Sequence, residues 1–352
     1  MTNSLLPRSI EELTPNWLSA ALGERFPGIE VTGLDIVQVI SGTTTKIRLK
    51  VSYANGIMLD GPPETLCVKG GFDERLHSFN TAALYQLEAN FFRYLAPRLS
   101  MPLPRCWFAA AEKGQGIVIF DDLVATGARF WLPTEAWTVD MVAAALESLA
   151  ALHAGTWGMD AAPFPWLTHG SPQVQAMIPA LFSDENWNDM LSRPDARFVP
   201  PSQLDRDRMM RAFSALWRRD AEGPMCLIHW DPHIGNTYID AGGQIRFVDW
   251  QCVCVAPYIH DVAYLIAGAM AINDRRAHER HLLDHYLVAL HRHGGPQITA
   301  DAVWLDYRRY QLYGFLWVLS STLMQPVDIV AAMTERHAVA IDDHETLAIL
   351  SA

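Results

Sequence analysis

The segment LIHWDPHIGNTYIDAGGQIRFVDWQ, from Leu227 to Gln251, places several polar side chains close together between apolar residues. The apolar runs LIH, TYID and QIRFVDW predict short strands, Pro232 and Gly235 predict a loop after the first of them, and AGG predicts a turn. The segment is therefore expected to form a β-hairpin preceded by a loop. Its polar residues are His229, Asp231, His233, Asn236 and Asp249.

Three oxygen-bearing side chains are expected at one end of this hairpin. Four residues separate Asp231 from Asn236, and Asp249 follows thirteen residues later. Carboxylate and amide oxygens are ligands that Mg²⁺ accepts where substrate phosphates supply further oxygens. Phosphoryl transfer from a nucleotide uses such a set, with one aspartate for the acceptor hydroxyl and an asparagine and a second aspartate for the metal.

A metallohydrolase site is an alternative for the same segment. HWDPH could supply His229, Asp231 and His233 as ligands of one metal ion. That site would leave Asn236 and Asp249 without a role, so phosphoryl transfer is favoured.

Composition narrows the class of protein. The chain has 352 residues, of which 50% are hydrophobic, and this is enough for two lobes. A formal charge of -12 argues against nucleic acid as the main partner. The five cysteines are scattered, and residues 1–15 lack the apolar core of a signal peptide, so a cytoplasmic location is expected. Cys252 and Cys254 would point to one face of a strand, but no second close pair completes a metal site, so they are expected to be buried thiols.

A membrane span is not expected. The least polar long stretch, Tyr310–Val327, contains glutamine, serine, threonine and proline and is followed by Asp328. A spanning helix needs about 20 more uniformly apolar residues. This stretch is therefore expected to be a buried helix.

The first part of the chain favours strands. A short helix should come first, with Thr14 as its N-cap and Pro15 in its first turn. A second helix is expected over residues 81–99. Strands are expected over residues 31–40, 45–53, 65–71 and 116–122.

Beyond a linker near residues 121–127, long helical runs dominate and only the hairpin segment interrupts them. The expected fold class is therefore α+β. It combines a small β-rich lobe of residues 1–122, which carries one helix among its strands, with a larger, mainly helical lobe of residues 123–352.

HWDPHIGN and FVDWQ resemble the catalytic and metal motifs of the aminoglycoside phosphotransferase and choline kinase superfamily, small-molecule relatives of protein kinases. Within it, the chain is most similar to the branch of ecdysteroid kinase-like proteins and bacterial phosphotransferases. The resemblance extends from about Val39 to the C-terminus. It implies a bilobal protein-kinase-like fold that uses ATP and Mg²⁺, with a nucleotide-binding first lobe and a catalytic and acceptor-binding second lobe.

The first lobe contains the two other residues that kinase chemistry needs, a lysine for the phosphates and a glutamate that holds it. Lys69 ends the apolar strand TLCVKGG and is one of only four lysines in the chain. Glu88 follows nineteen residues later in the helix expected at 81–99. Lys69 could instead be an exposed lysine at a strand end, and Glu88 could be an exposed charge on a helix. Both residues precede the Asp231, Asn236 and Asp249 set in the order that kinases use, and this order supports the kinase interpretation.

The turn within Ile40–Leu49 occupies the place of the phosphate-covering loop. It has one glycine, so backbone N–H groups and hydroxyls would have to hold the phosphates. Its candidate residues are Ser41, Gly42, Thr43 and Thr44.

The resemblance places the adenine-contacting linker at VIFDDL. Phe120 would lie beside the base, and backbone groups from Asp121 to Leu123 would hydrogen-bond it. Asp122 is equally consistent with a solvated charge.

Three further residues match positions of the superfamily. His153 is expected to be a buried structural histidine beneath the catalytic loop, and Asp261 is expected to brace that loop by hydrogen bonds. The superfamily usually has His-Gly-Asp where this chain has His229, Trp230 and Asp231. Trp230 is therefore expected to displace a neighbour, turn outward, or reshape or close the acceptor side of the site.

The resemblance implies transfer of the γ-phosphoryl group of ATP to a hydroxyl of a small molecule. Asp231 would accept or orient the hydroxyl proton, Asn236 and Asp249 would bind Mg²⁺, and Lys69, held by Glu88, would bind the phosphates.

Ten of the twelve tryptophans lie from Trp131 onward, which favours an apolar or aromatic alcohol as acceptor. The acidic stretches LFSDENWNDM and AIDDHETL keep an aminoglycoside as an alternative. A nucleotide-binding pseudokinase is a further alternative because of Trp230.

Overall fold

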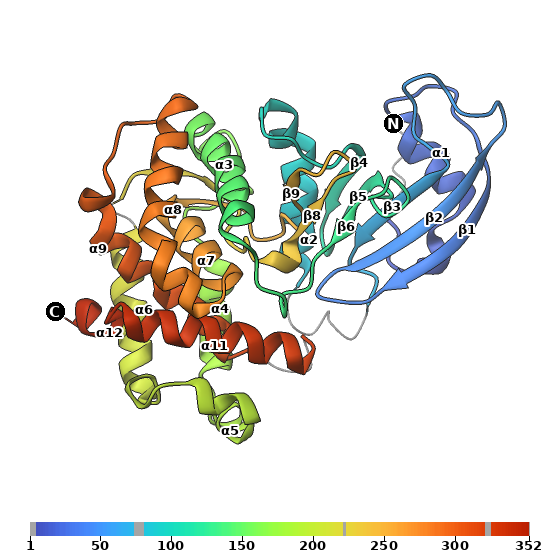
Figure 1. Ribbon diagram of the computed structural model, residues 1–352. Coiled ribbons are helices and arrows are strands. Elements are labelled where there is room, and N and C mark those ends of the chain that lie inside the picture. Colours follow the sequence, from blue (N-terminus) through green and yellow to red (C-terminus); the bar gives the residue numbers. More distant parts are fainter. Residues whose placement is uncertain (1–4, 74–80, 221–222, 321–324, 352) are drawn as a thin grey trace. The chain divides into compact units, whose positions relative to one another are not determined.

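The computed structural model describes residues 5–73, 81–220, 223–320 and 325–351 (Figure 1). The chain divides into two compact units. The first contains residues 1–129, 239–243 and 248–252, and the second contains residues 130–238, 244–247 and 253–352. The hairpin segment therefore contributes to both units: Asp249 belongs to the first, and Asp231 and Asn236 belong to the second.

The first unit is built on a five-stranded antiparallel sheet with the order β1-β2-β3-β5-β4. The strands are β1 (Val31–Ile40), β2 (Thr45–Tyr53), β3 (Thr65–Gly70), β4 (Cys106–Glu112) and β5 (Gln115–Asp121). Four of them were predicted. The edge strand β4 was missed because its sequence, CWFAAAE, contains three successive alanines, which have low strand propensity.

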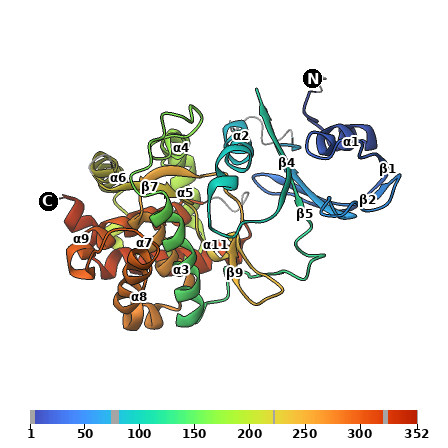
Figure 2. The same ribbon diagram turned by 90° about the horizontal axis from the view of Figure 1, so that it is seen from above.

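Two helices pack on opposite faces of this sheet (Figure 2). α1 (Pro15–Gly23) begins as predicted, with the Thr14 hydroxyl accepting a hydrogen bond from the Trp17 N–H at 3.2 Å. Its apolar side chains join the core formed by alternate residues of the strands, including Ile47. α2 (Ala82–Asn90) packs against β4 and β5 on the other face.

α2 continues beyond its last residue. A π-helical turn (Phe91–Leu95) and a 3-10 turn (Ala96–Arg98) follow it directly, so the helical run extends over residues 82–98 of the predicted 81–99.

The second unit is mainly helical, and α7 (Ile259–Ala269) lies at its centre, with every residue buried. A helix that is apolar on all sides belongs in the interior of a bundle. Around it are α3 (Val139–Gly155), α8 (Ile272–Arg292), α9 (Ala300–Tyr310) and α11 (Val327–Asp343). The other helices are α4 (Pro172–Leu181), α5 (Asp184–Ser192), α6 (Arg206–Asp220), α10 (Phe315–Val318) and α12 (Thr346–Ser351). The predicted α+β fold class is confirmed.

The hairpin segment forms β7 (Met225–Ile228), a 3-10 turn (Ile234–Asn236), β8 (Thr237–Ile239) and β9 (Ile245–Phe247). β8 and β9 share a three-stranded sheet with β6 (Arg129–Phe130).

The end of this segment differs from the prediction. β9 ends at Phe247, before the predicted end of its strand. β10 (Cys254–Pro257), which was not predicted, pairs with β7. Cys252 precedes β10, so the two late cysteines do not share a strand.

The prediction of one buried helix over Tyr310–Val327 was wrong. The chain forms a 3-10 turn (Gln311–Gly314) and then the short α10, and residues 321–324 lie outside the described residues. Gly314 allows close contact here, because a Cβ at this position would overlap the His337 ring. No helix in the described part of the chain is both long and apolar enough to cross a membrane.

Candidate functional site

Lys69 is the centre of a buried charged cluster in the first unit. Its Nζ lies 2.7 Å from Glu88 Oε2 and 2.8 Å from Asp249 Oδ1. The three side chains are 4%, 3% and 11% exposed, respectively. The structure therefore brings together the predicted phosphate-binding lysine, the glutamate expected to hold it and one predicted metal ligand.

Three elements place these side chains. Lys69 lies on β3 with its side chain on the sheet face opposite the core residue Val68, and Glu88 projects from α2. The Trp250 N–H donates a hydrogen bond to Glu88 Oε1 at 3.0 Å, and the Trp250 ring stacks on Phe91 at 4.6 Å. The residues after β9 are thus fixed to α2.

Burial and charge act against each other in this cluster. Burial alone would lower the pKa of Lys69, but the two carboxylates outweigh it and raise that pKa. Burial raises the pKa of Glu88, and the negative charge of Asp249 acts in the same direction against the attraction of Lys69. The charge of Lys69 therefore compensates these two carboxylates only in part.

The predicted phosphate-covering turn joins β1 and β2 in the same unit. Ser41 is exposed, Gly42 and Thr43 are half-buried, and Thr44 is buried. The Thr44 hydroxyl has no hydrogen-bond partner within the described ranges. A Cβ at Gly42 would meet the Thr44 carbonyl oxygen at 3.5 Å, an ordinary contact, so this turn does not require glycine there.

The predicted adenine linker follows β5. Asp122 is not a solvated charge: it is 3% exposed, and its carboxylate accepts two hydrogen bonds from Arg48 Nε at 2.9 and 3.0 Å. The Asp121 and Asp122 N–H groups bond to strand neighbours, and the Leu123 carbonyl accepts from the Ala128 N–H at 2.9 Å. Phe120 is buried against an aromatic side chain of the helical run after α2.

Asp231 in the second unit is held by neutral donors. Asn236 Nδ2 donates to Asp231 Oδ2 at 3.1 Å and to the Asp231 carbonyl at 2.9 Å, and the Tyr264 hydroxyl donates to Oδ1 at 3.0 Å. His233 Nε2 lies 3.7 Å from Oδ2. Both carboxylate oxygens are therefore oriented, while the side chain stays 24% exposed.

Asn236 is suited to bind a cation. Its amide nitrogen makes the two hydrogen bonds to Asp231, which leaves its amide oxygen as the group that can act as a metal ligand. Amide and carboxylate oxygens form a donor set that fits Mg²⁺.

Asp261 braces the loop that begins at His229, as predicted. It accepts hydrogen bonds from the His229 N–H at 2.7 Å and the Trp230 N–H at 2.9 Å. His153, fully buried, lies 3.3 Å from Asp261 through Nε2 and 2.8 Å from the Tyr286 hydroxyl through Nδ1. Burial would raise the pKa of Asp261, but its contacts with His153 and the other histidines lower it, so the brace keeps its negative charge.

Trp230 does not turn outward. Its indole is 7% exposed and stacks on His260 at 5.1 Å, with Tyr313 edge-on at 5.7 Å. Its backbone φ is +74°, in the left-handed region that glycine adopts without strain, which is why a glycine suits this position. His260 Nε2 also donates to the Trp230 carbonyl at 2.6 Å.

The metallohydrolase alternative is contradicted. Among the residues that the structure describes, no group of three or more His, Cys, Asp or Glu side chains could hold a metal ion. The His229 Nδ1 accepts from the Asp231 N–H at 3.3 Å, and the His233 Nδ1 accepts from the Gly235 N–H at 3.1 Å. These imidazoles therefore shape the loop.

Two residues close to these groups were not predicted. Lys46 on β2 places its Nζ 3.6 Å from Asp249 Oδ2, and Tyr264 on α7 bonds to Asp231. Because the chain has only four lysines, Lys46 could have been singled out from the sequence as a candidate phosphate-binding residue. Tyr264 lies three residues after Asp261, and this spacing puts both on one face of a helix.

Comparisons with known proteins concern the fold and the family. A search of curated proteins found no match. Among solved structures, a GDP complex of a mutant aminoglycoside 2′-phosphotransferase-IIIa is similar at a TM-score of 0.53 and 10% identity, covering 94% of this chain and 98% of that one. The GDP and kanamycin complex of an aminoglycoside phosphotransferase gives 0.52 and 9%, covering 93% and 99%.

A choline/ethanolamine kinase family protein from Mesorhizobium loti gives a TM-score of 0.47 and 16% identity, covering 95% of this chain and 98% of that one. At these identities the structural likeness concerns the fold. The sequence itself matches the phosphotransferase enzyme family over residues 74–308, which is well over half of its length. The chain therefore belongs to the phosphotransferase enzyme family.

Proposed function

We propose that this phosphotransferase transfers the γ-phosphoryl group of ATP to a hydroxyl of a small molecule. The observation that carries the proposal is the buried ion-pair cluster of Lys69, Glu88 and Asp249. Burying two carboxylates and a lysine carries a desolvation cost, and ligand binding by these groups is a reason for the chain to keep them. A lysine held by a glutamate beside a metal-binding aspartate is what polyphosphate binding requires.

The two units would contribute different steps. Lys69, held by Glu88, binds the α- and β-phosphates, while Asp231 orients the acceptor hydroxyl and takes its proton. Asn236 from the second unit and Asp249 from the first would hold Mg²⁺, which would supply positive charge for the phosphate oxygens. Asp231 is ready for its role because Asn236 and Tyr264 already fix both carboxylate oxygens.

The nucleotide would be bound by residues 1–122 and the acceptor by residues 123–352. The turn from Ser41 to Thr44 covers the phosphates, and the unpartnered Thr44 hydroxyl supports this role. In the Asp121–Leu123 linker, most backbone groups already bond to neighbours, so the Leu123 N–H is the donor we assign to the base.

We propose an apolar or aromatic alcohol as the acceptor. The support is the set of rings near Asp231: Tyr264 bonds to it, His233 approaches it, and Trp317 lies edge-on to His233 at a centroid distance of 5.0 Å. Aromatic walls with few charges suit an apolar ring system better than a polycation. We also place the chain in the ecdysteroid kinase-like branch on its HWDPHIGN and FVDWQ motifs.

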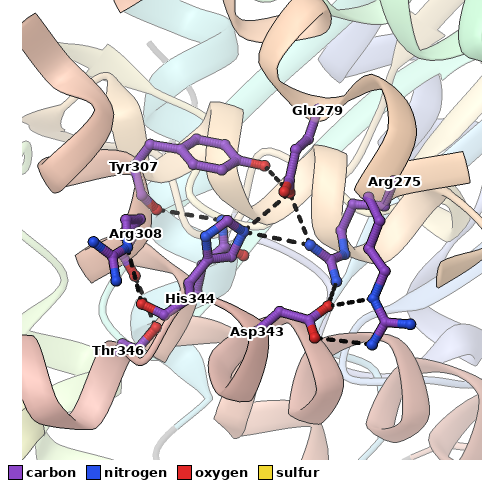
Figure 3. A network of polar contacts seen from close by, with 9 residues as sticks. Arg275, Glu279, Tyr307, Arg308, Asp343, His344 and Thr346 are labelled. Atoms are coloured by element: carbon purple, nitrogen blue, oxygen red, sulfur yellow. Dashed lines mark hydrogen bonds and ion pairs between the residues drawn. The ribbon is translucent and has the colours of Figure 1, made fainter. Parts of the chain in front are cut away.

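An aminoglycoside acceptor is less well supported, because its amines need carboxylates that are not already neutralised. In the acidic stretch near the C-terminus, Asp343 pairs with Arg275 (Figure 3). Asp343 also pairs with Arg276, and Glu345 pairs with Arg308. In the other acidic stretch, the pairs are Asp184 with Arg206 and Asp189 with Arg193. Arginines therefore already compensate most of these candidates.

The pseudokinase alternative also loses support. Trp230, the residue that suggested it, packs within the second unit against His260 and Tyr313. If ATP binds but no acceptor is phosphorylated, the Trp230→Gly variant separates a site blocked by the indole from a missing substrate.

The test is phosphorylation of a panel of sterols, phenols and aminoglycosides by the purified protein with ATP and Mg²⁺, with products identified by mass. We expect Asp231→Asn to reduce turnover by about 10³-fold, since a general base contributes about 10²–10⁴, and to leave ATP-dependent thermal stabilisation intact. Asp328→Asn, an exposed aspartate, is the control. Full activity in Asp231→Asn would contradict the proposal.

A further inference from the structure

Lys46 and Lys69 lie directly opposite each other on neighbouring strands. They are partners in the antiparallel register of β2 and β3. Each approaches a different oxygen of one carboxylate: Lys69 lies 2.8 Å from Asp249 Oδ1, and Lys46 lies 3.6 Å from Asp249 Oδ2. Two of the four lysines of the chain therefore converge on a single aspartate.

This arrangement needs an anion to be stable. Like charges directly opposite each other on paired strands repel, and the chain could avoid the repulsion with a neutral residue on either strand. Lys69 has Glu88 as a second partner, whereas Asp249 is the only ion-pair partner that the described residues give to Lys46. When Asp249 binds a cation, Lys46 requires another anion.

The position of Lys46 indicates which anion this is. It is the second residue of β2 and lies two residues after the turn from Ser41 to Thr44. Its side chain lies on the sheet face opposite that of Ile47, a core residue, and is 37% exposed. Lys46 can therefore reach a bound ligand without losing buried packing.

We propose that Lys46 is a second phosphate-binding lysine, which takes the terminal phosphates of the nucleotide while Lys69 takes those nearer the ribose. The inference rests on the proposed function and adds that Lys46 lets the protein distinguish nucleotides by their number of phosphates. Lys46 contributes to the binding of ATP, less to that of ADP and nothing to that of AMP, because AMP has no phosphate that reaches it. This contribution falls as salt rises, since the side chain is partly exposed.

The experiment compares Lys46→Met with Lys50→Met by calorimetric titration of ATP, ADP and AMP with Mg²⁺. Lys50 is the matched control, because it lies on the same strand and the same face but is exposed. We expect Lys46→Met to weaken ATP binding by about tenfold, which is ~1.4 kcal/mol, and to leave AMP binding unchanged. Lys46→Arg should restore most of the ATP affinity.

The outcomes separate the inference from the function on which it rests. Equal ATP affinities for Lys46→Met and Lys50→Met, or an equal loss for ATP and AMP, would overturn the role of Lys46 alone. Failure of the wild-type protein to bind any of the three nucleotides would overturn the proposed function and this inference together. Unfolding curves without nucleotide identify a variant that fails to fold, and Lys46→Gln then replaces Lys46→Met.

Discussion

The two halves of the proposed site solve the problem of burying charge in opposite ways. In the first unit, Lys69 sits between Glu88 and Asp249, so each charge is compensated by another charge. In the second unit, Asp231 is bound by an amide and a phenol and carries its charge without a buried cation. In the proposed function, the half that binds phosphate can therefore exchange ionic partners when ligands bind, whereas Asp231 in the other half is already oriented by neutral donors.

The largest effect should come from breaking the charged cluster. Lys69→Met leaves Glu88 and Asp249 buried without their cation, and loss of one partner of a buried ion pair costs about 3–5 kcal/mol. We expect a free energy of unfolding lower by that amount and an activity reduced by about 10²-fold, since charge compensation of the phosphates is lost. Urea denaturation and initial rates measure the two effects.

A double variant sharpens this test. Adding Glu88→Gln to Lys69→Met should recover part of the stability, because it removes one uncompensated carboxylate, but none of the activity. Lys113→Met, an exposed lysine on the loop between β4 and β5, should match the wild type in both measurements. If Lys69→Met were as stable as that control, the cluster would not be the ionic unit described here.

A smaller effect should come from the neutral donors. Tyr264→Phe keeps the ring that stacks on His260 and removes only the hydroxyl that donates to Asp231. A hydrogen bond to a charged group contributes ~1.5–3 kcal/mol, so kcat should fall by about 10- to 100-fold while the KM for ATP stays unchanged.

Tyr310→Phe is the matched control, since its hydroxyl donates to Asp220 in the same unit. It should lower stability without changing kcat. Asp231 would not depend on this donor if Tyr264→Phe changed only the KM for ATP. Equal kcat values in the two variants would show the same.

The smallest effect concerns acid. His337 on α11 is buried beside Tyr264, neither of its ring nitrogens has a hydrogen-bond partner within the described ranges, and burial lowers its pKa to about 3. The unfolded chain binds this proton near the ordinary value of 6.5, so stability is complete above pH 6.5 and is lost as the pH falls below it. One such proton gives a slope of at most ~1.4 kcal/mol per pH unit.

His337→Met should flatten the dependence of unfolding free energy on pH between about 6.5 and 4, where the ordinary histidine titrates. His278→Gln, an exposed histidine of α8, should leave the slope unchanged. Equal slopes for His337→Met and wild type would show that the buried His337 does not cause the loss of stability in acid.

Much of the fold could be predicted because local patterns agreed with it. Thr14 and Pro15 mark the start of α1. In β2, apolar and polar residues alternate in the sequence, and buried and more exposed residues alternate in the same way in the sheet. β4 was missed because its three alanines have low strand propensity, and their place in the sheet depends on tertiary contacts that the local sequence does not reveal. The helix expected over Tyr310–Val327 was wrong, because the chain forms a 3-10 turn over Gln311–Gly314 and α10 ends at Val318.

The sequence by itself determined the family and the kinds of residue available for chemistry. An ordered set of Lys69, Glu88, Asp231, Asn236 and Asp249 can be recognised without coordinates, because motif spacing is a local property. Only the tertiary structure decided how these groups are compensated: that Lys69 contacts two carboxylates, that Lys46 joins them, and that Trp230 turns inward. Those facts depend on side chains that are far apart in the chain, and packing alone brings them together.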